Sequence, residues 1–267
     1  MFKVKEIVSR NNIQVIGNGD RVIIFGHGFG CDQNTWRAVY PAFIEDFKIV
    51  LFDYVGAGRS DLSAYDESRY SSLDGYALDV VEICTSLDLQ NVIFVGHSVS
   101  SMIGLLAVQK DPSRFEKIVF IGPSPCYLNK PGYEGGIDLN DLEQLLDVMD
   151  SNYLGWSATM APLIMGTQNS PELADSLQAS FCATDPSIAR KFARVTFLSD
   201  NRDDLGGLKI PSLTIQCKDD FLTSVDIAEY INERMTLNQI TLLESSGHCP
   251  HLSDPEGVIE AIKNFIQ

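Results

Sequence analysis

The chain has 267 residues, of which 45% are hydrophobic and 21% charged, a composition that excludes a disordered, collagenous or coiled-coil protein. Lys and Arg number 20 and Asp and Glu number 36, and the resulting net charge of −16 repels nucleic acid and anionic lipid. No apolar run approaches the roughly 18 to 20 residues of a membrane span, and charged residues interrupt the start of the chain before a signal peptide could form. We therefore expect a cytoplasmic protein that binds neither nucleic acid nor membranes.

Short runs of β-branched and aromatic residues, bounded by turn residues, predict strands along most of the chain. The first two runs, residues 2–7 and 13–16, flank Arg10, Asn11 and Asn12 and predict an antiparallel hairpin. Six further strands are expected at residues 22–25, 49–52, 92–95, 118–121, 213–216 and 240–243. Segments with helical spacing, such as 73–84, 102–108 and 258–265, lie between several of them. The sequence thus predicts an α/β fold with a mostly parallel, eight-stranded sheet and helices on both faces.

The connection from Ile121 to Leu213 is about 90 residues long, far more than a usual connection between two strands of such a sheet. Helical spacing occurs in four segments of it, residues 138–149, 153–165, 171–181 and 186–198. We infer a four-helix insertion over one end of the sheet. The chain then divides into a first core segment at residues 1–125, the helical lid at 126–205 and a second core segment at 206–267.

The sharpest local motif follows the predicted strand at 92–95 and reads Gly96, His97, Ser98, Val99, Ser100. A Gly-x-Ser-x-small sequence between a strand and a helix is typical of a nucleophile elbow, whose tight turn needs small residues on both sides of the serine. The turn exposes the Ser98 hydroxyl at a helix N-terminus, where backbone N–H groups can stabilise developing negative charge. The alternative is an ordinary strand-to-helix turn in which Ser98 only caps the helix.

A serine nucleophile needs a base, and the chain has four histidines. His97 is adjacent to Ser98 in the elbow, so its side chain should point elsewhere. His248 follows the predicted strand at 240–243, at the edge of the sheet where active sites of open α/β folds lie. His248 is therefore the candidate base, and His251 is a weaker one.

The base in turn needs a carboxylate that fixes its tautomer. Asp219 and Asp220 both follow the predicted strand at 213–216, and so belong to the same edge of the sheet. With either aspartate the chain order is Ser98, Asp, His248, which is the order expected for this type of fold.

Two backbone N–H groups should form an oxyanion hole. One is that of Val99, directly after the candidate nucleophile. The other should come from Phe29, because the glycines around it in residues 26–30 would let the backbone approach a substrate. The alternative is a glycine-rich turn without a chemical role.

The six cysteines have irregular spacing without a Cys-x-x-Cys pair, and the sequence shows no grouping of ligands for a metal. We expect free thiols, no metal site and no cofactor.

Taken together, these motifs resemble the α/β-hydrolase superfamily and, more narrowly, the RsbQ-type stress regulators of bacilli and their relatives, the plant strigolactone and karrikin receptors. The broad resemblance rests on residues 27–30, 53–60, 96–100 and 247–251, and the narrower one on residues 122–129 and 151–153.

By position, the resemblance implies that Ser98 is the nucleophile, His248 the base and Asp220 the orienting carboxylate. Ser224 departs from the proline that usually follows this aspartate by four residues. Asp53 occupies a turn that is structural in this family.

The resemblance also implies that the lid covers an apolar pocket above Ser98, with Phe29, Val99, Trp156 and Phe197 at matching positions. Trp156 and Phe197 are equally compatible with an ordinary helix core.

The resemblance implies the first of two classes of function, and the predicted triad is compatible with both. The first is a serine hydrolase that processes or senses a small hydrophobic ester-like or lactone-like molecule and activates a protein partner, such as a sensor phosphatase of a stress pathway. The second is a metabolic carboxylesterase without an obligate partner. A receptor with little turnover is a third reading, because this scaffold supports many activities.

Overall fold

The computed structural model describes residues 4–267. Within this part of the chain, seven strands form one sheet in the order β1-β3-β2-β4-β5-β6-β7, parallel throughout except for the pair of β1 and β3. The strands are β1 (Gln14–Ile16), β2 (Arg21–Gly26), β3 (Phe47–Leu51), β4 (Val92–His97), β5 (Phe115–Ile121), β6 (Ser212–Asp219) and β7 (Asn238–Ser246). The expected α/β-hydrolase fold with a mostly parallel sheet is confirmed.

The N-terminal hairpin and the eighth strand were wrong predictions. Helix α1 (Val4–Arg10) replaces the strand expected at residues 2–7, of which residues 2 and 3 lie outside the described part. Val4, Ile7 and Val8 recur at helical spacing, and Ile7 is buried in the core. Arg10 in the last turn pairs with Glu82 at 2.5 Å, which anchors the helix to the domain. The antiparallel edge exists nevertheless, because β1 pairs with β3.

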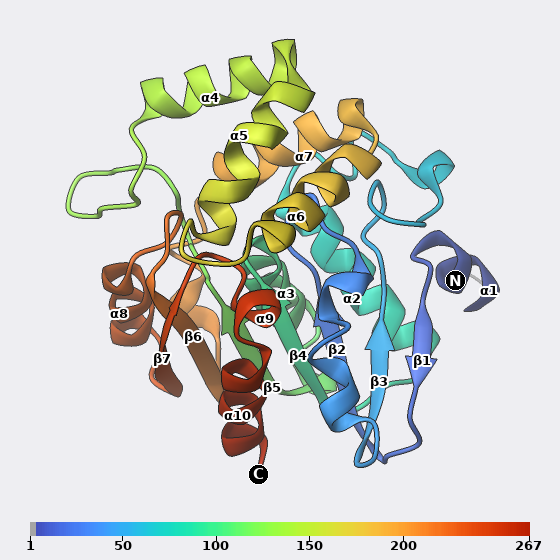
Figure 1. Cartoon of the computed structure of the whole chain (residues 1–267). Helices are drawn as coiled ribbons and strands as arrows, with labels where there is room; N and C mark the ends of the chain where they lie inside the picture. Colours follow the sequence, from blue (N-terminus) through green and yellow to red (C-terminus); the bar gives the residue numbers. More distant parts are fainter. Residues whose placement is uncertain (1–3) are drawn as a thin grey trace.

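Helices cover both faces of the sheet (Figure 1). One face carries α2 (Leu73–Ser86), α3 (Val99–Lys110) and α8 (Val225–Arg234), and the opposite face carries α10 (Pro255–Ile266). The short helix α9 (Pro250–Ser253) directly precedes α10.

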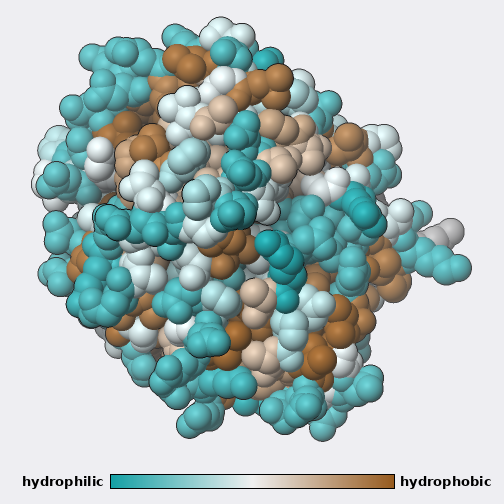
Figure 2. All heavy atoms as spheres, in the orientation of Figure 1, coloured by the Kyte–Doolittle hydropathy of each residue, from teal (hydrophilic) through white to brown (hydrophobic). Residues whose placement is uncertain are grey.

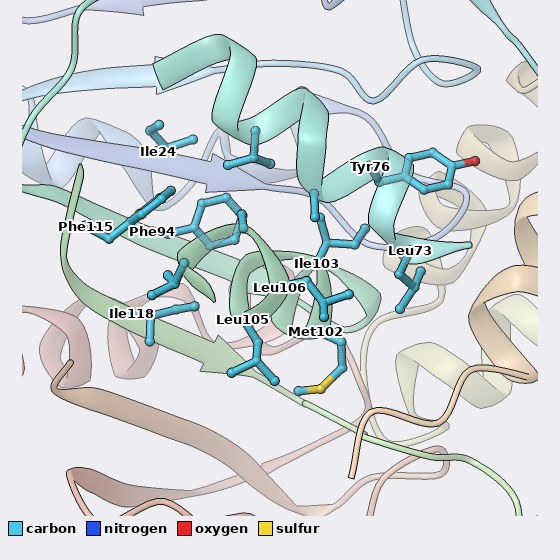
Figure 3. Packing of buried hydrophobic residues seen from close by; sticks show 14 of the residues in the cluster. Ile24, Leu73, Tyr76, Phe94, Met102, Ile103, Leu105, Leu106, Phe115 and Ile118 are labelled. Atoms are coloured by element: carbon cyan, nitrogen blue, oxygen red, sulfur yellow. The ribbon is translucent and has the colours of Figure 1, made fainter. Parts of the chain in front are cut away.

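The central strands are buried on both faces, as parallel strands between helical layers must be. Successive side chains of a strand point to opposite sides, so Val22 and Ile24 of β2 join one core cluster while Ile23 and Phe25 join the other. Figure 3 shows side chains of β2, β4 and β5 meeting those of α2 and α3, with Phe94 between the sheet and α3. This rigid core fixes the positions at which the strands end.

The four helices expected between β5 and β6 are confirmed as α4 (Leu139–Ser151), α5 (Tyr153–Met165), α6 (Pro171–Ala183) and α7 (Pro186–Phe197). They lie together over the carboxyl ends of the strands (Figure 1) and are called the lid below. Their inner faces form a third apolar cluster with loop residues such as Tyr127 and Cys249.

The surface is largely polar, although apolar side chains reach solvent at several places. Figure 2 shows apolar residues among polar ones around the part of the surface where Figure 1 places α4 and α5. Leu139 and Leu154 of these helices are 51% and 66% exposed. Among residues 4–267, no helix has both the length and the apolar character required to cross a membrane. All six cysteines are free thiols, as expected.

Candidate active site

Three side chains from the ends of three strands meet under the lid. Ser98 directly follows β4, Asp220 follows β6, and His248 follows β7 after a single glycine. His248 Nε2 lies 2.8 Å from Ser98 Oγ, and His248 Nδ1 lies 2.8 Å from Asp220 Oδ2. A carboxylate only accepts hydrogen bonds, so Nδ1–H of His248 donates to Asp220, and Nε2 of the neutral ring then accepts from the Ser98 hydroxyl. The arrangement forms a continuous chain of hydrogen bonds.

The turn that presents Ser98 is strained and depends on a glycine. Ser98 has φ +55°, a left-handed backbone conformation that residues other than glycine rarely adopt. A Cβ atom at Gly96 would lie 2.5 Å from the carbonyl oxygen of Ser100, so only glycine fits there. Ser100 occupies the position where the motif usually has a second glycine. Its hydroxyl donates to the carbonyl oxygen of His27 and lies 2.9 Å from the Tyr54 hydroxyl, so the substitution adds a contact to the loop after β2.

The structure separates the two adjacent aspartates. The side chain of Asp220 is only 1% exposed, whereas Asp219 is exposed at the end of β6. Burial alone raises the pKa of Asp220, but the nearby His248 and several hydrogen bonds outweigh it and hold this pKa below the usual value. Those bonds include the N–H of Leu222 at 2.8 Å and the hydroxyl of Thr223 at 2.8 Å.

The lid holds the loop that carries His248. The N–H of His248 donates to the carbonyl oxygen of Ile164 in α5 at 2.7 Å. Gly247 has φ +90°, and a Cβ atom there would lie 1.9 Å from the carbonyl oxygen of Met165. The close approach of the two backbones therefore requires glycine, and a movement of the end of α5 would be transmitted to His248.

The other three histidines make their hydrogen bonds to groups other than Ser98. His27 is buried after β2, where its Nε2 accepts from the N–H of Tyr54 at 3.2 Å. His97 directs its Nε2 at the carbonyl oxygen of His248 and not at Ser98, and burial lowers its pKa to about 3. His251, the weaker candidate base, lies on α9 with its Nε2 2.7 Å from the hydroxyl oxygen of Thr35.

The two expected oxyanion donors belong to the elbow itself and to the loop after β2. Val99 is the first residue of α3, so its N–H belongs to the N-terminal amides of the helix that have no acceptor within the helix. Phe29 lies in the loop after β2, and its ring contacts the aromatic rings of the lid. The ring of Phe29 lies 6.2 Å from that of Trp156 and 6.1 Å from that of Phe197.

A small cavity opens between Ser98, His248 and the lid. Trp156 and Phe197, the two lid residues singled out by the sequence, both line it. Its volume is about 30 Å³, which is the room of roughly one water molecule. Further residues, not singled out as pocket residues from the sequence, also line the cavity: Cys31, His97, Ile164, Leu177, Phe181, Thr196, Leu222 and Cys249.

Tyr127 is a further neighbour of Ser98 that sequence reasoning did not single out. Its hydroxyl lies 3.5 Å from Ser98 Oγ, and its ring lies 5.1 Å from that of Phe197. Burial raises the pKa of Tyr127 to about 12, so the phenol keeps its proton and can only be a donor or acceptor of hydrogen bonds. The segment after β5 carried a family resemblance but no pattern that would mark this tyrosine.

Within residues 4–267, no group of three or more His, Cys, Asp or Glu side chains is placed to hold a metal ion. Ser98, His248 and Asp220 are bonded to one another, whereas His97 Nδ1, Trp156 Nε1 and Thr196 Oγ1, from residues that line the same cavity, are buried without a hydrogen-bond partner among the described residues.

The fold and this arrangement are those of an α/β hydrolase, and comparison with known proteins shows the same class. Residues 23–261 match the model of the Alpha/beta hydrolase family. The chain belongs to this family.

Among individual proteins, the chain is 35% identical to Karrikin insensitive 2 receptor CA of Petunia hybrida, with 96% of this chain and 95% of that protein covered. It is 34% identical to Strigolactone esterase D14 of Arabidopsis thaliana, with 97% of both chains covered. A solved structure of a hydrolase from Oleispira antarctica superposes with a TM-score of 0.97 at 44% identity, covering 100% of this chain and 98% of that one. The expected similarity to strigolactone and karrikin receptors is thereby confirmed.

Proposed function

We propose that this protein is a serine hydrolase that cleaves small, largely apolar esters or lactones through Ser98, His248 and Asp220. The observation that carries the proposal is the buried chain of hydrogen bonds from Asp220 through His248 to Ser98, with both distances at 2.8 Å. Such a chain fixes the tautomer of the base and directs its lone pair at the serine proton. Relatives named esterase add support.

The reaction proceeds in two steps. Ser98 Oγ attacks the carbonyl carbon while its proton passes to Nε2 of His248, and Asp220 stabilises the imidazolium that forms. The N–H groups of Phe29 and Val99 stabilise the oxyanion, and the proton on His248 then passes to the leaving oxygen. In the second step, water gives a proton to His248 and attacks the acyl carbon, the bond from that carbon to Ser98 Oγ breaks, His248 returns the proton to Oγ, and the carboxylic acid leaves. These steps need neither a metal nor a cofactor.

The pocket restricts the substrate to small, mostly apolar molecules. Its walls are mainly aromatic and aliphatic and include the rings of Trp156, Phe181 and Phe197. A cavity of about 30 Å³ is far below the volume of a usual ligand site, so a substrate must displace lid side chains as it binds. Because α5 also bonds to the backbone of His248, binding and the position of the base are linked.

We further propose that hydrolysis serves signalling, with a protein partner such as a sensor phosphatase of a stress pathway. Relatives named receptors support this reading, as does a lid whose outer side exposes Leu139 and Leu154. A metabolic carboxylesterase without a partner is the competing assignment. Signalling predicts that Ser98→Ala abolishes a stress response in cells even when the products of hydrolysis are supplied, whereas a metabolic role predicts rescue by those products.

The first test is labelling of the purified protein with phenylmethylsulfonyl fluoride, followed by intact mass, together with turnover of p-nitrophenyl acetate. We expect one adduct and ester cleavage in the wild type, and neither in Ser98→Ala. Ser101→Ala is the matched control, since Ser101 is a buried serine in the first turn of α3, the helix that Ser98 precedes, and its hydroxyl donates to the carbonyl oxygen of Gly96. An unlabelled, inactive wild type would contradict the proposed hydrolase.

A further inference from the structure

Two buried histidines, His97 and His251, have no part in the proposed reaction but lie in a row of rings with His248, the proposed base. The ring of His97 lies 5.1 Å from that of His248 and 4.3 Å from that of His251. His97 and His251 are 2% and 0% exposed. Polar rings are seldom buried without a specific partner, so this cluster requires an explanation.

His97 makes its hydrogen bond to the main chain of His248. Its Nε2 lies 2.8 Å from the carbonyl oxygen of His248. Because a carbonyl oxygen only accepts, the proton of His97 must be on Nε2, and Nδ1 then carries a lone pair. That Nδ1 atom is buried and has no hydrogen-bond partner among the described residues. The main-chain bond is therefore the polar contact that orients this ring.

The ring of His97 is confined from two further sides. A Cβ atom at Gly28 would lie 2.5 Å from His97 Nδ1, so the loop after β2 packs directly on the ring and needs glycine there. On the other side lies the ring of His251, which is itself held by Thr35 at 2.7 Å and by the ring of Trp36 at 4.8 Å. His97 thus has little freedom to leave its acceptor.

We propose that His97, packed against His251, is a positioning residue that holds the backbone of His248 so that its imidazole bridges Ser98 and Asp220. The inference rests on the proposed hydrolase function of Ser98. Both main-chain polar groups of His248 are hydrogen-bonded: its carbonyl oxygen accepts from His97 Nε2, and its N–H donates to the carbonyl oxygen of Ile164 in the lid. Fixing both ends of one residue leaves its side chain a narrow range of positions. A displacement of about 1 Å in such a site can cost up to 100-fold in rate.

The test compares His97→Leu, which removes the donor, with His97→Gln, whose amide nitrogen can take the place of Nε2. For each variant, the rate of labelling by phenylmethylsulfonyl fluoride and kcat and KM for p-nitrophenyl acetate are measured, with Ser98→Ala as the blank. We expect His97→Leu to lower the labelling rate and kcat by about 10- to 100-fold with little change in KM. His97→Gln should retain most of the wild-type rate.

Nuclear magnetic resonance of the protein with 15N-labelled histidine supplies a readout that does not depend on activity. In the wild type, we expect a proton on Nε2 of His97 and on Nδ1 of His248. In His97→Leu, the Nδ1–H signal of His248 should broaden or shift as its bond to Asp220 loosens.

A His97→Leu protein that is labelled at the wild-type rate would overturn the inference, as would equal losses in the Leu and Gln variants. If the Leu variant does not fold, the wild-type spectrum decides, because a proton on Nδ1 of His97 is incompatible with the bond to His248. If the wild type itself is not labelled, the proposed function fails, and the His248 signal in the two variants still decides whether His97 positions the loop.

Discussion

Asp220 and His248 form a buried pair, with Oδ2 and Nδ1 2.8 Å apart and side chains only 1% and 3% exposed. Asp219, one residue earlier, has an exposed side chain and serves the same loop through its backbone, because its carbonyl oxygen accepts from the N–H of Gly247 at 2.7 Å. Asp220 thus holds His248 through its side-chain carboxylate, whereas Asp219 holds the loop before His248 through its main-chain carbonyl.

This difference predicts opposite outcomes for two matched substitutions. Asp220→Asn should lower kcat for p-nitrophenyl acetate by about 10³-fold or more, since an amide cannot stabilise the imidazolium and favours the wrong tautomer of His248. Asp219→Asn should change kcat by less than about threefold, because it leaves the carbonyl in place. Steady-state kinetics of both purified variants provide the check. Equal losses would show that the two carboxylates share the role.

The buried histidines predict that acid destabilises the protein below neutral pH. Burial lowers the pKa of His27, His97 and His251 in the folded state, His97 to about 3. The unfolded chain binds protons at these residues below its ordinary histidine pKa of about 6.5, while the folded protein does not. Their contribution to stability is therefore complete above about pH 6.5 and is lost as the pH falls toward the folded values.

Each such histidine contributes a slope of about 1.4 kcal/mol per pH unit within this window. Urea unfolding at pH values from 7 to 5 measures the slope. His251→Gln should lower the number of protons taken up on unfolding by about one, and the slope falls accordingly. Burial also raises the pKa of Asp79, whose protonation in the folded state opposes this slope, so the comparison with the variant decides: a slope unchanged in His251→Gln would contradict a neutral buried His251. The lowered pKa of Asp220 acts below the ordinary carboxyl range near pH 4, so it does not interfere.

Gly30 links the loop of Phe29 to the lid, and replacing it should disturb both. It has φ +70°, and a Cβ atom would lie 2.1 Å from the ring of Phe181 in α6. Gly30→Ala should lower the free energy of unfolding by about 2 kcal/mol and raise KM, because Phe181 also lines the pocket. Gly206→Ala is the control, since nothing lies within 4 Å of its added Cβ. Thermal unfolding of the two variants should therefore differ clearly.

Tyr127 should make a small contribution to the reactivity of Ser98. The Ser98 hydroxyl donates to His248, so the Tyr127 hydroxyl can only donate to Ser98 Oγ, and 3.5 Å is at the limit of a hydrogen bond. Tyr127→Phe keeps the ring contact with Phe197, and we expect the rate of labelling by phenylmethylsulfonyl fluoride to change by less than about threefold. A loss above tenfold would place the phenol in the reaction itself.

Much of the fold could be predicted from local sequence. The central strands were located to within a few residues, for example 22–25 against Arg21–Gly26, because strands buried on both faces are short, continuous apolar runs. The lid helix at 153–165 was predicted with the bounds that it has in the structure. The elbow was recognisable because its turn permits only small residues on either side of Ser98.

The N-terminal segment shows where local pattern was insufficient. The seven residues Val4–Arg10 carry apolar side chains at Val4, Ile7 and Val8, and so short a pattern is compatible with a strand or with one face of a helix. The helix is stabilised by contacts with α2, through Ile7 in the core and Arg10 at Glu82, and those partners lie some 70 residues along the chain.

The sequence by itself determined the class of fold, the elbow at Ser98 and the strand ends at which Asp and His residues occur, because turn chemistry and periodicity are properties of neighbouring residues. Only the tertiary structure decided which aspartate faces His248, that Tyr127 lies beside Ser98 and that His97 bonds to the backbone of His248. These relationships join residues from 28 to 151 positions apart. Their geometry is set by the packing of the sheet and the lid, and no local pattern records it.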